Sequence, residues 1–413
     1  MDIQRVVSHG GIEAWLVEEH SIPLIALSAS FHGGSRMDPA GKEGVSSMLA
    51  SLLDEGAGDL DAQAFQERLE GKAIGLRFGS DIDSFSASLS TLSQNRDEAF
   101  AMLALALTKP RLDAEPVERV RGQYISARLR LVEDPESYAQ ELWIEKALPG
   151  TVYGRPGDGT EASLKAITVQ DLRSYAAANL TRDRLKISVV GDIDAKTLGA
   201  LLDKTFGALP KKGVAVKIKD ITPSGAGETI VERRDIPQSV VVFGGPGLKR
   251  DDPDFYAATV LDSIVGGSGF ASRLTEEVRE KRGLAYGVYT YLMPLDYAGL
   301  TGGGVATQNA AVKESIDIIK SELARVVKDG VTAQELQDTK TYLTGSYALR
   351  FDTNAKIARI LTAVQLENLG IDYIKTRNKL IDAVTLADIK RVAPRVYSPG
   401  KMLFVVVGDP AGM

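Results

Sequence analysis

The chain of 413 residues has no cysteine and three histidines, His9, His20 and His32. Without cysteine, a thiolate nucleophile, a disulfide bond and a cysteine-rich zinc site are excluded. No two histidines have the spacing of a metal-binding pair on one helix. Ser47 and Ser51 are candidate nucleophiles by residue type, but a histidine base would have to come from these three N-terminal residues. The residue types therefore disfavour an independent hydrolase with a catalytic centre of its own.

Arg279 and Tyr286 lie in the segment REKRGLAYGV, where a helical pattern ends near Arg282 and a strand begins near Leu284. Taken alone, both have an ordinary structural explanation. An arginine near a helix end complements the helix dipole, and a tyrosine on a strand packs against its neighbours. The charged run from Glu276 to Arg282 is explained in the same way, as a solvated helix face.

A glycine-rich turn precedes this segment, in the sequence IVGGSGFASRL. Its glycines are Gly266, Gly267 and Gly269. They are typical of a helix C-cap followed by a turn.

An internal repeat organises the elements that carry these residues. The stretch AITVQDLRSYAAANLTRDRLKISVVGD (166–192) aligns without a gap on AVTLADIKRVAPRVYSPGKMLFVVVGD (383–409). Each copy opens with a capping-box pattern, which predicts a helix, and ends in an apolar β-branched run closed by Gly-Asp, which predicts a buried strand. Residues 22–39 match residues 236–253 at nearly the same offset. The chain is therefore two copies of one fold.

The boundary between the copies falls in a segment rich in Pro, Gly and Lys, which predicts a linker over residues 211–227. The predicted domains are residues 1–210 and 228–413. Apolar spacing predicts a helix from Val45 to Leu53 that ends at Gly56, and another from Val312 to Val326 that ends at Gly330. We expect an α+β fold in which each of the two homologous domains is a β-sheet covered on one face by helices.

The formal net charge of −6 disfavours nucleic acid as a partner, since that would require a basic surface. No apolar run approaches the length of a membrane span, and the N-terminus lacks the pattern of a secretion signal. The early start of domain-like sequence fits a periplasmic form whose signal has been removed, and a cytoplasmic location is the alternative.

Several segments resemble the pitrilysin-like (inverzincin) zinc metallopeptidase family, which includes the mitochondrial processing peptidases. In that family a helix carries H-x-x-E-H, whose histidines bind zinc while its glutamate activates the attacking water, and a later glutamate is the third ligand. The matching helix is GVSSMLASLLDEGAG (44–58), and the third-ligand position falls at Ala127, before Glu133-Asp134-Pro135. The four functional positions are therefore Ser47, Ala50, Ser51 and Ala127. The resemblance implies a chain without zinc or any other cofactor of its own.

The same resemblance gives Arg279 and Tyr286 a role, because the family's R-x-x-x-x-x-x-Y element binds the scissile carbonyl and its transition state. Gly266, Gly267 and Gly269 resemble, more weakly, a substrate-handling loop of the non-catalytic processing-peptidase subunit. The chain is thus expected to form a heterodimer with a homologous zinc-bearing subunit, to enclose extended peptides in a chamber, and to supply Arg279 and Tyr286 in trans. By itself it is expected to be inactive.

Two other functions remain open from the sequence. One is a non-proteolytic scaffold, as in members of this family that belong to respiratory complexes. The other is a peptide-binding pseudoenzyme that acts as a homodimer. The presence of both Arg279 and Tyr286 favours the peptidase subunit over a scaffold, because a scaffold does not require them.

Overall fold

The computed structural model describes residues 1–267 and 272–413. Its chain contacts define two compact units. The first unit comprises residues 1–128, 156–216 and 349–373, and the second comprises residues 129–155, 217–348 and 374–413. Among the described residues, no helix has the length and apolar character needed to cross a membrane.

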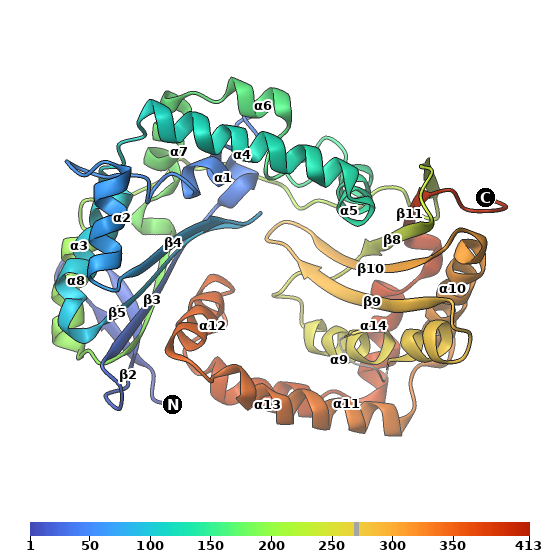
Figure 1. The fold of residues 1–413 in the computed structure, drawn as a ribbon. Helices are drawn as coiled ribbons and strands as arrows, with labels where there is room; N and C mark the ends of the chain where they lie inside the picture. The colour runs from blue at the N-terminus through green and yellow to red at the C-terminus, as the bar shows by residue number, and fades with distance from the viewer. Residues whose placement is uncertain (268–271) are drawn as a thin grey trace. The chain divides into compact units, whose positions relative to one another are not determined.

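The first unit is built on a sheet with the strand order β1-β2-β6-β3-β5-β4 (Figure 1). Its strands are β1 (Gln4–Val7), β2 (Glu13–Glu18), β3 (Leu24–His32), β4 (Gly75–Ser80), β5 (Ser84–Leu92) and β6 (Leu185–Gly191). Its helices are α1 (Val45–Ala50), α2 (Ala62–Gly71), α3 (Arg96–Thr108), most of α4 (Ala114–Glu133), α6 (Glu161–Ala166), α7 (Val169–Asn179), α8 (Ala195–Phe206) and α12 (Asn354–Leu366). Leu27, Ala29 and Phe31 of β3 point into one apolar core with the helices α1, α3 and α8.

The second unit is built on a sheet with the strand order β7-β11-β8-β10-β9. Its strands are β7 (Thr229–Arg233), β8 (Gln238–Pro246), β9 (Ala285–Pro294), β10 (Gly299–Gln308) and β11 (Leu403–Gly408). Its helical elements are α5 (Pro135–Ala147), α9 (Phe255–Val265), η4 (Thr275–Glu280), α10 (Val312–Asp329), α11 (Ala333–Gly345), α13 (Tyr373–Asp382) and α14 (Leu386–Val396). Val241 and Phe243 of β8 lie in a second apolar core, which helices α9, α10 and α14 complete.

The two sheets repeat one topology. In each, a parallel pair (β2 with β6, β7 with β11) is followed by three antiparallel strands. The capping boxes that the sequence predicted in the two repeats begin α7 at Thr168 and α14 at Thr385, and a further capping box begins α11 at Thr332. The predicted α+β class with two similar domains is therefore confirmed.

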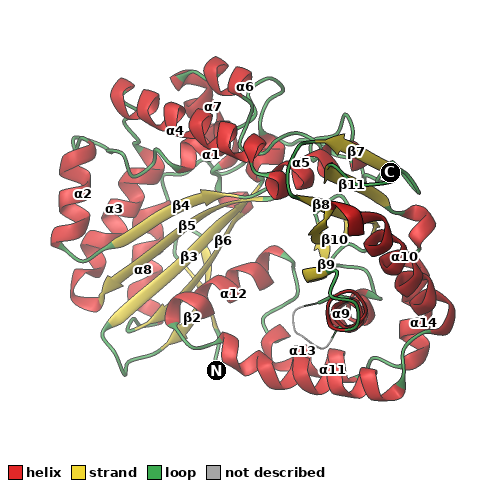
Figure 2. Ribbon diagram, turned by 45° about the vertical axis from the view of Figure 1, so that its right-hand side comes forward, coloured by secondary structure: helices red, strands yellow, loops and turns green. Residues whose placement is uncertain are grey.

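The sequence did not predict one arrangement. Each sheet is also covered on its second face, by one helix that comes from the other half of the sequence (Figure 2). Helix α5 packs against β8 and β11, and Trp143 Nε1 donates a hydrogen bond to the carbonyl oxygen of Leu403 at 3.2 Å. Helix α12 packs against β3 and β6, where Thr362 Oγ1 donates to the carbonyl oxygen of Ser28 at 3.1 Å. The compact units are therefore not continuous stretches, and the predicted boundary at residues 211–227 stays a prediction about the repeats.

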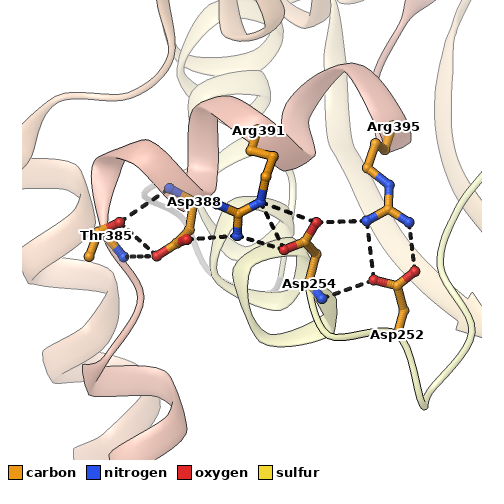
Figure 3. A network of polar contacts seen from close by, with 6 residues as sticks. All are labelled: Asp252, Asp254, Thr385, Asp388, Arg391 and Arg395. Carbon is orange, nitrogen blue, oxygen red and sulfur yellow. Dashed lines mark hydrogen bonds and ion pairs between the residues drawn. The ribbon is translucent and has the colours of Figure 1, made fainter.

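An ion-pair network attaches α14 to the segment before α9 (Figure 3). Asp254 accepts hydrogen bonds from Arg391 Nη2 and Arg395 Nη1, both at 2.7 Å. Arg395 also contacts Asp252, and Arg391 also contacts Asp388 of the α14 capping box. The network joins two helices that pack on the same sheet face.

Candidate functional site

The helix at the zinc-motif position, α1, is entirely buried and ends earlier than the sequence predicted. Its last residue is Ala50, and residues 51–55 continue as turns up to Gly56. Leu52 and Leu53 are nevertheless fully buried, as the apolar pattern required. Ser47 is 4% exposed and therefore needs a hydrogen-bond partner.

The polar groups of Ser47 and Ser51 are hydrogen-bonded to side chains from other parts of the first unit. Ser47 Oγ donates to Asp158 Oδ1 at 2.8 Å, and the Tyr124 hydroxyl donates to the carbonyl oxygen of Ser47 at 2.9 Å. The same phenol lies 3.0 Å from Ser51 Oγ. Burial raises the pKa of Tyr124, so the phenol stays protonated at neutral pH. Tyr124 belongs to α4 and stands three residues before Ala127, which is exposed.

These residues do not fit a zinc ion. The hydroxyls of Ser47 and Ser51 are hydrogen-bonded to Asp158 and Tyr124, and neither Ala50 nor Ala127 offers a ligand atom. In the part of the chain that the structure describes, no three His, Cys, Asp or Glu side chains form a group that could hold a metal ion. The hydroxyls of Ser47 and Ser51 contact Asp158 and Tyr124 rather than a histidine base, so this helix offers no means of activating water.

His20 lies in a surface cluster of the first unit. Its Nδ1 is 2.7 Å from Asp192 Oδ1, and its Nε2 is 3.2 Å from Glu18 Oε2. Hydrogen bonds that His20 donates to Asp192 and then to Glu18 raise the pKa of His20. The contacts stabilise the turn after β6, which is an ordinary structural role.

Arg279 and Tyr286, which the sequence singled out, lie side by side in the second unit. Arg279 is in η4, a π-helical turn, and Tyr286 is the second residue of β9. The guanidinium carbon is 5.0 Å from the centre of the tyrosine ring, a cation–π distance. Arg279 Nε is also 3.4 Å from Glu280 Oε1. The Tyr286 side chain is 89% exposed, so a second molecule can reach it. Their catalytic role stays a prediction.

A cavity of about 370 Å³ adjoins Tyr286 on the face of the second sheet. Gly304 and Ala306 of β10 contribute to its lining, together with Tyr289 and Glu136. Tyr289 donates a hydrogen bond to Glu136 Oε1 at 3.2 Å, and burial together with this carboxylate raises the pKa of Tyr289 to about 12. A Cβ atom on Gly304 would lie 2.9 Å from the Tyr289 hydroxyl, so glycine leaves room for the ring. Next to the cavity, β9 is the last strand of its sheet, and the Thr290 amide on its outer side donates a hydrogen bond to the carbonyl oxygen of Gly266 at 2.9 Å.

In the glycine-rich turn, Gly266 and Gly267 have the contacts expected of a helix C-cap followed by a turn. Gly266 is the C-cap of α9, and the amides of Gly266 and Gly267 both donate to the carbonyl oxygen of Asp262. A Cβ atom on Gly266 would lie 2.8 Å from the backbone nitrogen of Thr290, so close packing requires glycine there. Gly269 lies outside the described residues. A substrate-handling role for these glycines stays a prediction.

Sequence reasoning missed several residues that shape these sites. Tyr124 and Asp158 form hydrogen bonds with the two serines at the zinc-motif positions of this chain. In the second unit, Asp262 is a buried carboxyl that accepts hydrogen bonds from Thr290 and Tyr397. Burial raises the pKa of Asp262. Its isolation in the apolar run of α9 was a signal in the sequence, whereas nothing local marked Tyr124 or Asp158.

Comparison with known proteins places these observations in a family context. Residues 166–343 match the family model described as the peptidase M16 inactive domain. The protein named non-peptidase homolog YmxG of Helicobacter pylori is 27% identical, over 95% of this chain and 90% of its own length. The probable mitochondrial-processing peptidase subunit beta of Schizosaccharomyces pombe is 24% identical, over 92% and 85%.

A solved structure extends the similarity to the whole fold. The crystal structure of a peptidase M16 inactive domain from Pseudomonas fluorescens superimposes with a TM-score of 0.93 at 27% identity. The alignment covers 100% of this chain and 98% of that one. The family resemblance inferred from the sequence is therefore confirmed.

Proposed function

Residues 166–343 belong to the peptidase M16 inactive-domain family, and from this premise we propose that the chain is the zinc-free subunit of a heterodimeric metallopeptidase. Its partner would be a homologous chain with an intact H-x-x-E-H motif, which holds the zinc ion. The pair would cleave extended peptides inside a closed chamber, and neither zinc nor water activation would come from this chain.

The observation that carries the proposal is the pairing of Arg279 with an exposed Tyr286 in a chain whose own zinc-motif positions cannot hold metal. A guanidinium and a neutral phenol suit an oxygen that gains negative charge when water attacks a peptide carbonyl. Both groups would act on a carbonyl positioned at the partner's zinc site. The stretch of the terminal strand β9 near Tyr286 and the adjoining cavity offer a place where an extended peptide could pair as an added strand.

The experiment compares this chain alone, its zinc-bearing homologue alone, and the mixture, on a quenched fluorescent peptide with zinc content measured in each sample. We expect only the mixture to cleave, with zinc in the homologue. In the mixture, Arg279→Ala and Tyr286→Phe should each reduce turnover by about 10²–10³, the loss typical of one donor to a developing oxyanion.

Arg5→Ala and Tyr342→Phe are matched controls, because both side chains are exposed and lie outside the site. They should leave turnover unchanged. Cleavage by this chain alone, or a mixture no faster than the homologue, would contradict the proposal.

A second candidate is a peptide-binding or scaffold protein without proteolytic function. It is favoured by the name of the Helicobacter pylori relative, a non-peptidase homologue. Under this alternative, peptides would bind to the chain and Tyr286→Phe would change their affinity, but no partner would restore cleavage. A neighbouring gene for a zinc-bearing homologue would argue against it.

A further inference from the structure

We infer that the ion pair between Arg273 and Glu335 positions Arg279 for its contact with substrate, an inference that rests on the proposed function for the role of Arg279. The pair joins the residue two positions before η4 to the first turn of α11. Neither residue would touch the peptide, so both are positioning residues rather than catalytic ones.

The pair has the geometry of a strong, directional contact. Arg273 Nε lies 2.6 Å from Glu335 Oε1, and Arg273 Nη2 lies 2.7 Å from Oε2. This bidentate arrangement fixes the orientation of the guanidinium plane as well as its distance. The side chain of Arg273 is 12% exposed and that of Glu335 is 30% exposed, so solvent screens the pair less than it screens a surface contact.

Glu335 is a fixed anchor. Its Oε2 also accepts hydrogen bonds from the Thr332 amide at 2.7 Å and from Thr332 Oγ1 at 2.9 Å, which completes the capping box of α11. Burial would raise the pKa of Glu335, but the bonds from Arg273 and Thr332 outweigh it and lower that pKa to about 2. The Glu335 carboxylate is therefore ionised throughout the physiological pH range. Its helix, α11, is itself held in place by packing on α9.

A second ion cluster holds the other end of η4. Glu277 accepts hydrogen bonds from Lys281 Nζ and Arg282 Nη1, both at 2.7 Å, and its side chain is 12% exposed. Arg279 therefore lies in a short element that charged contacts attach at both ends.

The η4 element needs such contacts because it is short. Six residues in a π-helical turn form few internal hydrogen bonds, so the element has little intrinsic stability. Val278 and Leu274 bury one side of it in the core. On the other side, a cavity of about 370 Å³ lies between η4 and the start of α11, and both Arg273 and Glu335 line it. The ion pair thus bridges a gap that apolar packing leaves open.

A probe on Tyr286 tests the inference without any need for proteolysis. The chain is labelled with 3-fluorotyrosine, and the Tyr286 signal in its fluorine spectrum is identified by its loss in Tyr286→Phe. Arg279→Ala then shows where the signal lies when no guanidinium covers the ring. Glu335→Gln removes the charge but keeps a carbonyl for the Thr332 cap, and Arg273→Lys keeps the charge but loses the bidentate geometry.

We expect both variants to move the Tyr286 signal most of the way toward its position in Arg279→Ala. Asp388→Asn is the matched control, since Asp388 also closes a capping box and contacts an arginine, but on α14. It should leave the signal in place. If Glu335→Gln and Arg273→Lys both fold, by circular dichroism, and both keep the wild-type signal, the inference is wrong, whatever the mixture cleaves.

Kinetics in the mixture with the zinc-bearing homologue provide the second measurement. Glu335→Gln should lower kcat by about tenfold with little change in KM, as expected for a residue that acts on the transition state through the position of Arg279. In an Arg279→Ala background, the same substitution should have almost no further effect. Losses that multiply independently would overturn the inference. A shifted fluorine signal in a mixture that never cleaves would support positioning while contradicting the proposed function.

Discussion

Tyr124 is the single side chain that best explains how α1 stays stable without a metal ion. Its phenol contacts the backbone of Ser47 and the hydroxyl of Ser51, one turn apart on the same segment. A polar group that loses its partner on burial costs roughly 1–3 kcal/mol, so the bonds to the Ser47 carbonyl oxygen and the half-buried Ser51 hydroxyl stabilise this segment.

Tyr124→Phe should therefore lower the free energy of unfolding by about 1–2 kcal/mol, because Ser47 and Ser51 each lose a hydrogen bond while the ring remains. Urea denaturation followed by circular dichroism measures the change. Tyr342→Phe, at an exposed tyrosine on α11, should have no effect. Equal stability of the Tyr124→Phe variant and the wild type would mean that water satisfies the two serines.

At this scale the sequence located the candidate residues but not the contacts that surround them. The match over residues 44–58 located three motif positions, the Glu133-Asp134-Pro135 segment located Ala127, and the REKRGLAYGV segment located Arg279 and Tyr286. Tyr124 could not be predicted, because its partners depend on how α4 packs against α1. The roles of Arg273 and Glu335 were hidden for the same reason, since 62 residues separate them in the chain.

Elements were predictable where the signal was local. The capping boxes of α7 and α14 and the glycine that ends α10 are signals within a few residues, so these three helices matched the sequence. The packing of α5 on the second sheet and of α12 on the first could not be predicted, because the apolar face of a helix does not reveal which sheet it covers. The contacts that attach one helix to another were hidden as well, and the network of Figure 3 is an example.

That network should make stability depend on acid pH. Hydrogen bonds from Arg391 and Arg395 outweigh burial and lower the pKa of Asp254, and the pKa of Asp388 is lowered to about 2 by Thr385 and Arg391. Both carboxyls titrate near pH 4 when the chain is unfolded. They therefore contribute stability that is complete above about pH 4 and is lost as the pH falls toward 2.

The measurement is the urea midpoint between pH 7 and pH 2.5. Asp254→Asn should reduce it most at pH 7, and the curves of variant and wild type should converge at the acid end. Asp317→Asn, at an exposed ion pair on α10, is the control and should change little at any pH. Parallel curves for Asp254→Asn and the wild type would rule out a titrating role for the network.

At the scale of the whole molecule, the exchanged helices make each unit depend on the other half of the sequence. A fragment of residues 1–216 would contain the whole first sheet but lack α12. It would lose the hydrogen bonds that Gln365 donates to the carbonyl oxygen of Ile187 and to Ser188 Oγ, both at 2.8 Å. We expect the fragment to be less stable than the intact chain.

A synthetic peptide of residues 349–373 should bind this fragment and raise its melting temperature in proportion to the logarithm of peptide concentration. Differential scanning fluorimetry measures the shift. The same peptide with Thr362→Ala and Gln365→Ala, which lacks the polar contacts to β3 and β6, is the control and should bind more weakly. No shift with the unaltered peptide would show that α12 adds nothing to the stability of the first sheet.

Because α12 and α5 each cover a sheet from the other half of the sequence, the order of synthesis determines when each sheet is completed. Translation proceeds at about 5–20 residues per second, and α12 ends about 150 residues after the last N-terminal segment of its unit. The first sheet would thus wait roughly 8–30 s on the ribosome for its second cover. The uncovered strands present Ser28, Ser30 and Ser188, hydroxyl groups that water can solvate. Trp143 waits longer for its hydrogen-bond acceptor, because Leu403 emerges 260 residues later. A nascent chain stalled before β11 would therefore leave α5 covering β8 alone, with the indole N–H of Trp143 lacking that acceptor.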